Sequence, residues 1–221
     1  MGRFARVATA ISVVGLVVLG GAAAAPPEEP PGLSIAADAS GSVSAIVADR
    51  VCEQARGRSG QRGPCAAEAT AGATAATAAT PEQLKADGDL VSASGRKLAA
   101  YIETTPVGTI WTRTWWQETR GLYYINWWEK HTGRIYWHTG GTHVWSTGGA
   151  HGYTGRHNCD QGGGIAYDIR VTSCFTERLA TNHINEWDYW KVYVFFQGFP
   201  ISASHNMHAS AWGSGNIYFY W

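Results

Sequence analysis

The aromatic residues of this chain are concentrated in its second half. All 11 Trp lie from Trp111 onward, whereas residues 26–104 contain a single aromatic side chain, Tyr101. Aromatic side chains bury the largest apolar areas, so only the second half can build a large core. We therefore expect an aromatic-rich core domain over residues 106–221, preceded by a flexible Ala/Gly/Pro-rich arm with short helices over residues 25–105.

Alternation within the second half indicates strands. Ile165, Tyr167, Ile169 and Val171 are apolar and are separated by polar positions such as Asp168 and Arg170, which is the period of a half-buried strand. Glycine-rich turns separate similar runs at 109–118, 122–130, 134–139, 142–147, 186–197, 200–212 and 217–221, with turns expected at His131–Gly133 and Gly140–Gly141. The pattern predicts an all-β fold, an antiparallel β-sandwich of about seven to nine short strands.

The first residues are typical of an export signal. Arg3 and Arg6 precede an apolar stretch from Val7 to Leu19 and a run of Gly and Ala, which predicts a signal peptide over residues 1–24. The apolar stretch is too short for a spanning helix. We therefore expect a secreted, extracellular protein with no membrane segment after signal removal.

The arm that follows is poor in apolar side chains. Val43, Ile46 and Val47 fit a short helix over 42–56 with Ser42 as its N-cap, and Pro81 suits the first turn of another over 81–85. A third short helix is predicted over 95–102. The Ala/Thr tract over 66–80 is expected to be a linker.

The 4 cysteines admit three pairings or a zinc site. Pairing Cys52 with Cys65 and Cys159 with Cys174 keeps each bridge within one compositional zone, and export permits disulfides. A zinc site is disfavoured because no C-x2-C spacing occurs.

Charge and motifs restrict the function classes. Lys and Arg together number 17, as do Asp and Glu, so no basic patch for nucleic acid is expected. No nucleophile motif, zinc-protease motif or phosphate loop is present, so we expect a non-enzymatic protein without a cofactor. A glycosidase pair remains an alternative among the carboxylates near the aromatic residues: Glu118, Glu129, Asp168, Glu186 and Asp188.

The histidines give weak support to a metal site. His205 and His208 are three residues apart, which on a strand places their rings on opposite faces. His138 and His143 flank a turn, while His151 and His157 lie near glycines. Hydrogen-bonding surface histidines are the favoured interpretation, and no metal is expected.

Neighbouring tryptophans supply the candidate binding surface. Trp115–Trp116 and Trp127–Trp128 must each place one indole outside the sandwich if they lie on strands. A protein-binding face is favoured over a carbohydrate platform, because no polar partners for sugar hydroxyls are identifiable. The candidate binding residues are Trp111, Trp115, Trp116, Trp127, Trp128, Trp137 and Trp145.

A set of short motifs resembles a group of small exported β-proteins of actinobacteria. The motifs cover roughly residues 107–221: GRIY at 133–136, Trp145, GYTGRHNC at 152–159, IAYDI at 165–169, TSC at 172–174, Pro200-Ile201 and Met207-His208. That group is similar to the small adaptor subunit of umbrella toxin particles, which joins a lectin-bearing subunit to the long toxin subunit. A weaker likeness, in the aromatic C-terminal ending, is to lactococcin 972-type bacteriocins.

The resemblance implies a fold and a class of partner. An adaptor of an antibacterial toxin complex would bind other secreted protein subunits without chemistry of its own. The alternatives are a carbohydrate or cell-wall binding module and a free-standing bacteriocin.

Overall fold

Two antiparallel sheets make up the protein. The computed structural model describes residues 33–36, 38–59, 63–88, 109–122, 127–146, 157–160, 167–196 and 198–221. The expected antiparallel β-sandwich is confirmed, although the longest strands have 14 residues rather than being short. Within these ranges no helix has the length and apolar character needed to cross a membrane.

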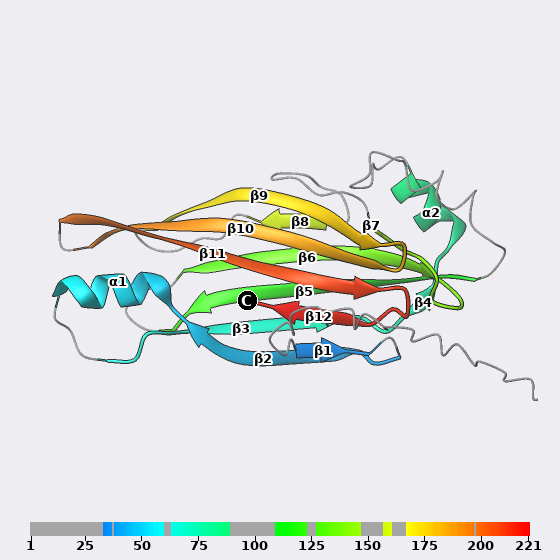
Figure 1. Cartoon of the computed structure of the whole chain (residues 1–221), viewed down its shortest axis with the longest axis horizontal. Coiled ribbons are helices and arrows are strands. Elements are labelled where there is room, and N and C mark those ends of the chain that lie inside the picture. The colour runs from blue at the N-terminus through cyan, green and yellow to red at the C-terminus, as the bar shows by residue number, and fades with distance from the viewer. Residues whose placement is uncertain are drawn as a thin grey trace, which may run out of the picture. The chain divides into compact units, whose positions relative to one another are not determined.

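Sheet A is built mainly from the end of the chain (yellow to red in Figure 1). Its order is β1-β12-β11-β10-β9. Gly198, with a φ of 86°, turns β10 into β11, and a glycine-rich turn leads from β11 into β12. The strands are β1 (Leu33–Ile35), β9 (Tyr167–Ala180), β10 (His183–Phe196), β11 (Phe199–Trp212) and β12 (Ile217–Tyr220).

Sheet B faces it and comes from the earlier part of the chain (blue to green in Figure 1). Its order is β2-β3-β5-β6-β7, with β4 paired to β5 and β8 paired to β6. The strands are β2 (Gly41–Ala48), β3 (Ala66–Ala73), β4 (Thr77–Ala78), β5 (Ile110–Gly121), β6 (Trp128–His138), β7 (Val144–Ser146) and β8 (His157–Asp160).

The Ala/Thr tract is a strand, so the linker interpretation was wrong. Strand β3 lies between β2 and β5, and its Ala67, Ala69, Ala71 and Ala73 are buried in the interior. Alanine has little strand preference of its own, but small side chains leave room for the indole of Trp115 in the same core. The expected arm over 25–105 thus contributes strands to both sheets.

The helix predicted over 42–56 was misplaced. Residues 41–48 form β2, and helix α1 (Arg50–Ser59) begins after Asp49. Asp49 caps this helix, because its Oδ1 accepts hydrogen bonds from the backbone N–H groups of Val51 and Cys52 at 3.0 and 2.9 Å. Its other oxygen accepts from Trp127 Nε1 at 3.3 Å.

Helix α2 (Pro81–Gly88) is confirmed and extends beyond the predicted residue 85. Asp87, on this helix, accepts a hydrogen bond from the hydroxyl of Tyr136 and pairs with Arg134 at 3.3 Å. The helix predicted over 95–102 lies outside the described residues, as does the signal peptide.

The turn predicted at His131–Gly133 was wrong. Strand β6 runs through it, and His131 is buried. Gly133 is required for space rather than for a turn, because a Cβ there would lie 2.4 Å from Cζ2 of Trp115. The turn at Gly140–Gly141 is confirmed, with φ values of 99° and 72°.

Both expected disulfides are present. Cys52–Cys65 ties α1 to the start of β3, with a Cα–Cα distance of 5.3 Å. Cys159 lies on β8 of sheet B and Cys174 on β9 of sheet A, with a Cα–Cα distance of 6.0 Å. The second bridge therefore joins the two sheets covalently.

Arg113 fixes the ends of several segments from inside the sandwich. Its guanidinium donates to the carbonyl oxygens of Ala36, Ala39 and Gly215 at 2.8, 2.7 and 3.1 Å. Its Nε donates to Thr74 O at 3.0 Å. These bonds connect the segment after β1 to the turn before β12, and satisfy a buried cation with backbone dipoles.

Candidate functional site

The expected binding tryptophans are mostly interior. Trp115, Trp127 and Trp137 lie in the cores between the sheets, and Trp145 is buried with Tyr136 against residues that include Leu84 of α2. The remaining three, Trp111, Trp116 and Trp128, are half-buried. The predicted split of each Trp pair is therefore seen, but four of the seven indoles offer no surface to a partner.

An outward cluster of aromatic side chains lies instead on sheet A. Alternation along β10 sends Trp190, Val192 and Val194 into the core, so the intervening side chains point to the opposite face. Aromatic residues occupy this outer face on four neighbouring strands. We call the set Phe175, Trp187, Tyr189, His208 and Tyr220 the aromatic ladder.

Ring geometry within the ladder is specific. The ring centroids of Trp187 and His208 are 4.0 Å apart, and those of His208 and Tyr220 are 4.4 Å apart with planes 7° from parallel. His208 is thus stacked on Tyr220, whereas the Trp187 ring lies against it with its plane tilted by 30°. Phe175 extends the ladder onto β9, where its ring is within 2° of parallel to that of Tyr189 at 6.0 Å.

Stacking determines what the ladder presents to solvent. The flat faces of Trp187, His208 and Tyr220 are directed at one another across β10, β11 and β12, so their edges point outward. A sugar ring stacks on a free aromatic face, which the middle of the ladder does not offer. Ring edges with polar atoms suit a surface that is packed and hydrogen-bonded by another protein.

His208 is the buried centre of the ladder. Burial between the neighbouring rings, with the charge of His183 as a smaller cause, lowers its pKa to about 4. The imidazole is therefore neutral at physiological pH.

Further apolar and polar side chains surround the ladder. Phe195 is 69% exposed and Trp212 is 37% exposed, the latter stacked on His183 at 3.8 Å. Trp187 Nε1 donates to Glu177 Oε2 at 3.0 Å, which orients the central indole. Near the other end of β10, Arg170 and Lys191 each lie 5.1 Å from the ring centre of Tyr193.

The carboxylates considered for a glycosidase pair do not form an open site. Glu118 and Asp168 pair with Arg120 and Arg170 on outer faces. Glu129, Glu186 and Asp188 are buried in the sandwich. Burial raises the pKa of Glu186 to about 8, opposed by contacts with Ser146 and Trp115.

The histidine pairs differ in their placement. His205 stacks inward on Trp190 while His208 belongs to the outer ladder, so the predicted opposite orientation is confirmed. His138 and His143 both lie near Trp145, with ring-centroid distances of 6.0 and 5.8 Å. His151 and the side chain of His157 lie outside the described residues. Across the residues that are described, no group of three His, Cys, Asp or Glu side chains is arranged to hold a metal.

Comparisons with known proteins leave the family open. No family model matches the chain. No curated protein and no solved structure matches it either. The functional argument therefore depends on the geometry of the described residues.

Sequence reasoning missed the ladder because its members are distributed from residue 175 to residue 220. The available signal was the alternation of side chains along one strand, which places Trp187, Tyr189, Tyr193 and Phe195 on the same face. Assigning His208 and Tyr220 to the same face requires the strand register, which pairs Trp187 with His208 and His208 with Tyr220.

Proposed function

We propose that this chain is a secreted, non-enzymatic protein-binding module whose docking surface is the aromatic ladder with its flanking side chains. The observation that carries the proposal is the close contact of the His208 ring with Trp187 on one strand and Tyr220 on another, at centroid distances of 4.0 and 4.4 Å. It leaves ring edges and polar ring atoms as the contact surface. The rigid stack lowers the entropy cost of ordering these side chains when a partner binds.

The composition of the face supports the same conclusion. Trp and Tyr are the residues that contribute most at protein interfaces, particularly where polar groups surround them. Here Trp187, Tyr189 and Tyr220 are half-buried, so they are already held in place while retaining surface for contact. Glu177 and His183 provide polar groups beside them.

Other observations support the proposed location and partner. The leader sequence and the two disulfides support an extracellular setting. The motif resemblance supports the more specific proposal that the partners are other secreted subunits and that the chain is an adaptor in an antibacterial toxin complex.

Affinity capture from culture medium tests the proposal. A tagged full-length chain is expected to co-purify with a partner in fixed stoichiometry. Phe175→Ser removes a ladder ring that is 39% exposed, so it should weaken the complex about thirtyfold.

Ile46→Ser is the matched control. Ile46 is 67% exposed on β2 of sheet B, so its removal also deletes an exposed apolar side chain but leaves sheet A unchanged. Both variants should unfold at about the wild-type temperature. A chain recovered only as a free monomer, or a Phe175→Ser variant that retains its partner fully, would contradict the proposal.

A carbohydrate-binding role is the second candidate, favoured by Trp116. Its half-buried indole lies over Gly72, where a Cβ would be 2.5 Å from both Cε2 and Nε1. An indole supported on one side by a glycine is a suitable stacking surface for a sugar. Retention on insoluble cell wall that is abolished by Trp116→Ala and unaffected by Phe175→Ser would establish this role instead.

A further inference from the structure

The hairpin formed by β10 and β11 projects beyond the other strands of sheet A at one end of the protein. Strand β9 pairs with β10 only as far as Tyr167 opposite Val194, and β12 pairs with β11 only from His208 onward. Within the described part of the chain, the last residues of the hairpin therefore have no further strand beside them. This tip and helix α1 lie at the same end of the molecule (Figure 1).

The outer side of the tip is apolar and exposed. Phe195 is 69% exposed, and Pro200, its register partner on β11, is exposed as well. Residues 192–204 contain no charged side chain. A projecting apolar patch of this kind is typical of a surface that contacts a membrane or another protein.

The inner side of the tip is packed. Val194 and Ile201 are buried in one cluster with Val51 and Ala55 of α1. The Cys52–Cys65 disulfide in turn ties α1 to the start of β3. Phe195 is therefore presented from a rigid support, so burying it against a partner costs little conformational entropy.

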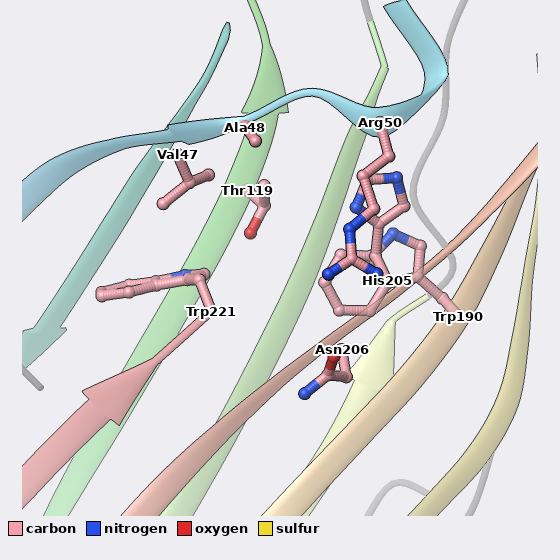
Figure 2. A pocket seen from close by; sticks show the side chains of 8 residues that line it. All are labelled: Val47, Ala48, Arg50, Thr119, Trp190, His205, Asn206 and Trp221. Carbon is pink, nitrogen blue, oxygen red and sulfur yellow. The ribbon is translucent and has the colours of Figure 1, made fainter. Parts of the chain in front are cut away.

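Basic side chains lie at one level behind the tip. Lys191 is the register partner of Arg170 on β9 and of Ser204 on β11. Arg50 reaches the same level, because its guanidinium donates to Ser204 O at 3.5 Å. Figure 2 shows the side chain of Arg50 extending from the start of α1 toward β11.

This basic level has an excess of positive charge. Arg170 pairs with Asp168 at 2.5 Å and contributes little net charge. Glu53 and Arg56 are both exposed on α1 and offset each other. Neither Lys191 nor Arg50 forms an ion pair with a described carboxylate. These two cations are therefore available to an anionic partner.

The order of side chains along the hairpin fits the surface of a lipid bilayer. Lys191 Nζ lies over the ring of Tyr193, which is two residues from Phe195, so the charge is about 7 Å behind the tip residue. Peripheral proteins bury apolar side chains about 5–10 Å deep, with aromatic and basic residues at the headgroups. We propose that this tip binds the surface of an anionic lipid bilayer. Phe195 enters the acyl region, Tyr193 lies at the interface, and the two cations contact lipid phosphates.

The contact is peripheral and separate from the aromatic ladder. It requires no segment that spans the bilayer. Phe195 lies eight residues beyond Trp187 on β10, about 26 Å at strand spacing. A protein bound at the ladder therefore leaves the tip accessible.

Vesicle co-sedimentation of the full secreted chain tests the proposal. The anionic vesicles contain equal parts of phosphatidylcholine and phosphatidylglycerol, and vesicles of phosphatidylcholine alone provide an uncharged surface. The chain should bind the anionic vesicles in a saturable manner and the uncharged ones about tenfold more weakly.

Three variants connect binding to the tip. Phe195→Ser should weaken binding about thirtyfold, because it removes the apolar side chain that the bilayer buries. Phe195→Trp should bind like the wild type, because Trp is favoured at the membrane interface. Lys191→Gln should weaken binding to anionic vesicles about fivefold and leave binding to uncharged vesicles unchanged.

Leu179→Ser is the matched control. Leu179 is 49% exposed near the other end of β9, so its removal deletes an exposed apolar side chain of the same sheet and leaves the tip unchanged. This variant and Phe175→Ser should bind vesicles like the wild type, so the outcomes for the tip and for the ladder are distinguishable. All these variants should unfold at about the wild-type temperature.

The inference fails if the chain does not sediment with anionic vesicles, if Phe195→Ser binds them as well as the wild type, or if Leu179→Ser weakens binding equally. Loss of a secreted protein partner in Phe195→Ser, without vesicle binding by the wild type, would assign the tip to a protein interface and would also overturn it.

Discussion

Replacing Glu186 by Gln should change how the stability of this protein depends on pH. Glu186 is fully buried between the sheets, and its pKa is raised from 4.5 to about 8 by burial. The folded protein therefore binds a proton that the unfolded chain releases above pH 4.5. The free energy of unfolding must then fall as pH rises through this interval, until the folded carboxyl ionises near pH 8.

The slope contributed by one such group is about 1.4 kcal/mol per pH unit. Between pH 6.5 and pH 8 this amounts to ~2 kcal/mol, because the side chain is fully buried and solvent screening is minimal. This pH range also separates the effect of Glu186 on stability from the effects of His205 and His208, whose pKa values are lowered to about 4. Protonation of those histidines lowers the free energy of unfolding only as the pH falls toward and below 6.5, whereas ionisation of Glu186 acts as the pH rises.

Urea unfolding followed by tryptophan fluorescence provides the measurement. The wild type is expected to lose ~2 kcal/mol more than Glu186→Gln across the window. Gln has nearly the same shape and does not titrate, so subtracting the two curves cancels every other group. Parallel curves for the two proteins would refute the assignment of a neutral, buried carboxyl at this position.

Three further changes have defined outcomes. Gly133→Ala should destabilise the fold by ~1–3 kcal/mol in urea unfolding, because its Cβ would overlap the Trp115 ring, whereas Gly57→Ala meets nothing within 4 Å and should be neutral or stabilising. Removing the Cys159–Cys174 bridge by double alanine substitution should cost about 3 kcal/mol, and an unchanged unfolding midpoint would count against its role in joining the sheets. Tyr136→Phe deletes the hydrogen bond to Asp87, so hydrogen exchange should accelerate across α2; unchanged exchange there would show that this contact does not hold the helix.

Prediction from the sequence succeeded where apolar and polar side chains alternate along a strand. Ile169 is buried while Asp168 and Arg170 are exposed, as their alternation indicates. The aromatic strands at the end of the chain and their glycine turns were found for the same reason. Large apolar residues at a period of two leave few alternatives for the backbone.

Prediction failed where contacts with another strand of the same chain decide the conformation of a segment. Ala67–Ala73 has the composition of a linker, and only the indoles packed nearby explain why small residues form a central strand. Gly133 looked like a turn residue because its constraint, the Trp115 ring, lies on another strand. Tertiary contacts of this kind override local preference.

The candidate site shows the same limit more strongly. The sequence predicted that each neighbouring Trp pair divides between the two faces, but gave no means of assigning the outward member. The ladder requires the register of β9, β10, β11 and β12 together. A binding surface assembled across strands is therefore visible only after the strands are paired.

The pairing of β1 with β12 has a consequence for how the protein folds. Leu33 lies opposite Phe219, so β1 has no partner in sheet A until β12 is available. Pairing β1 then requires a very long loop to be ordered, which makes completion of this edge of sheet A slow.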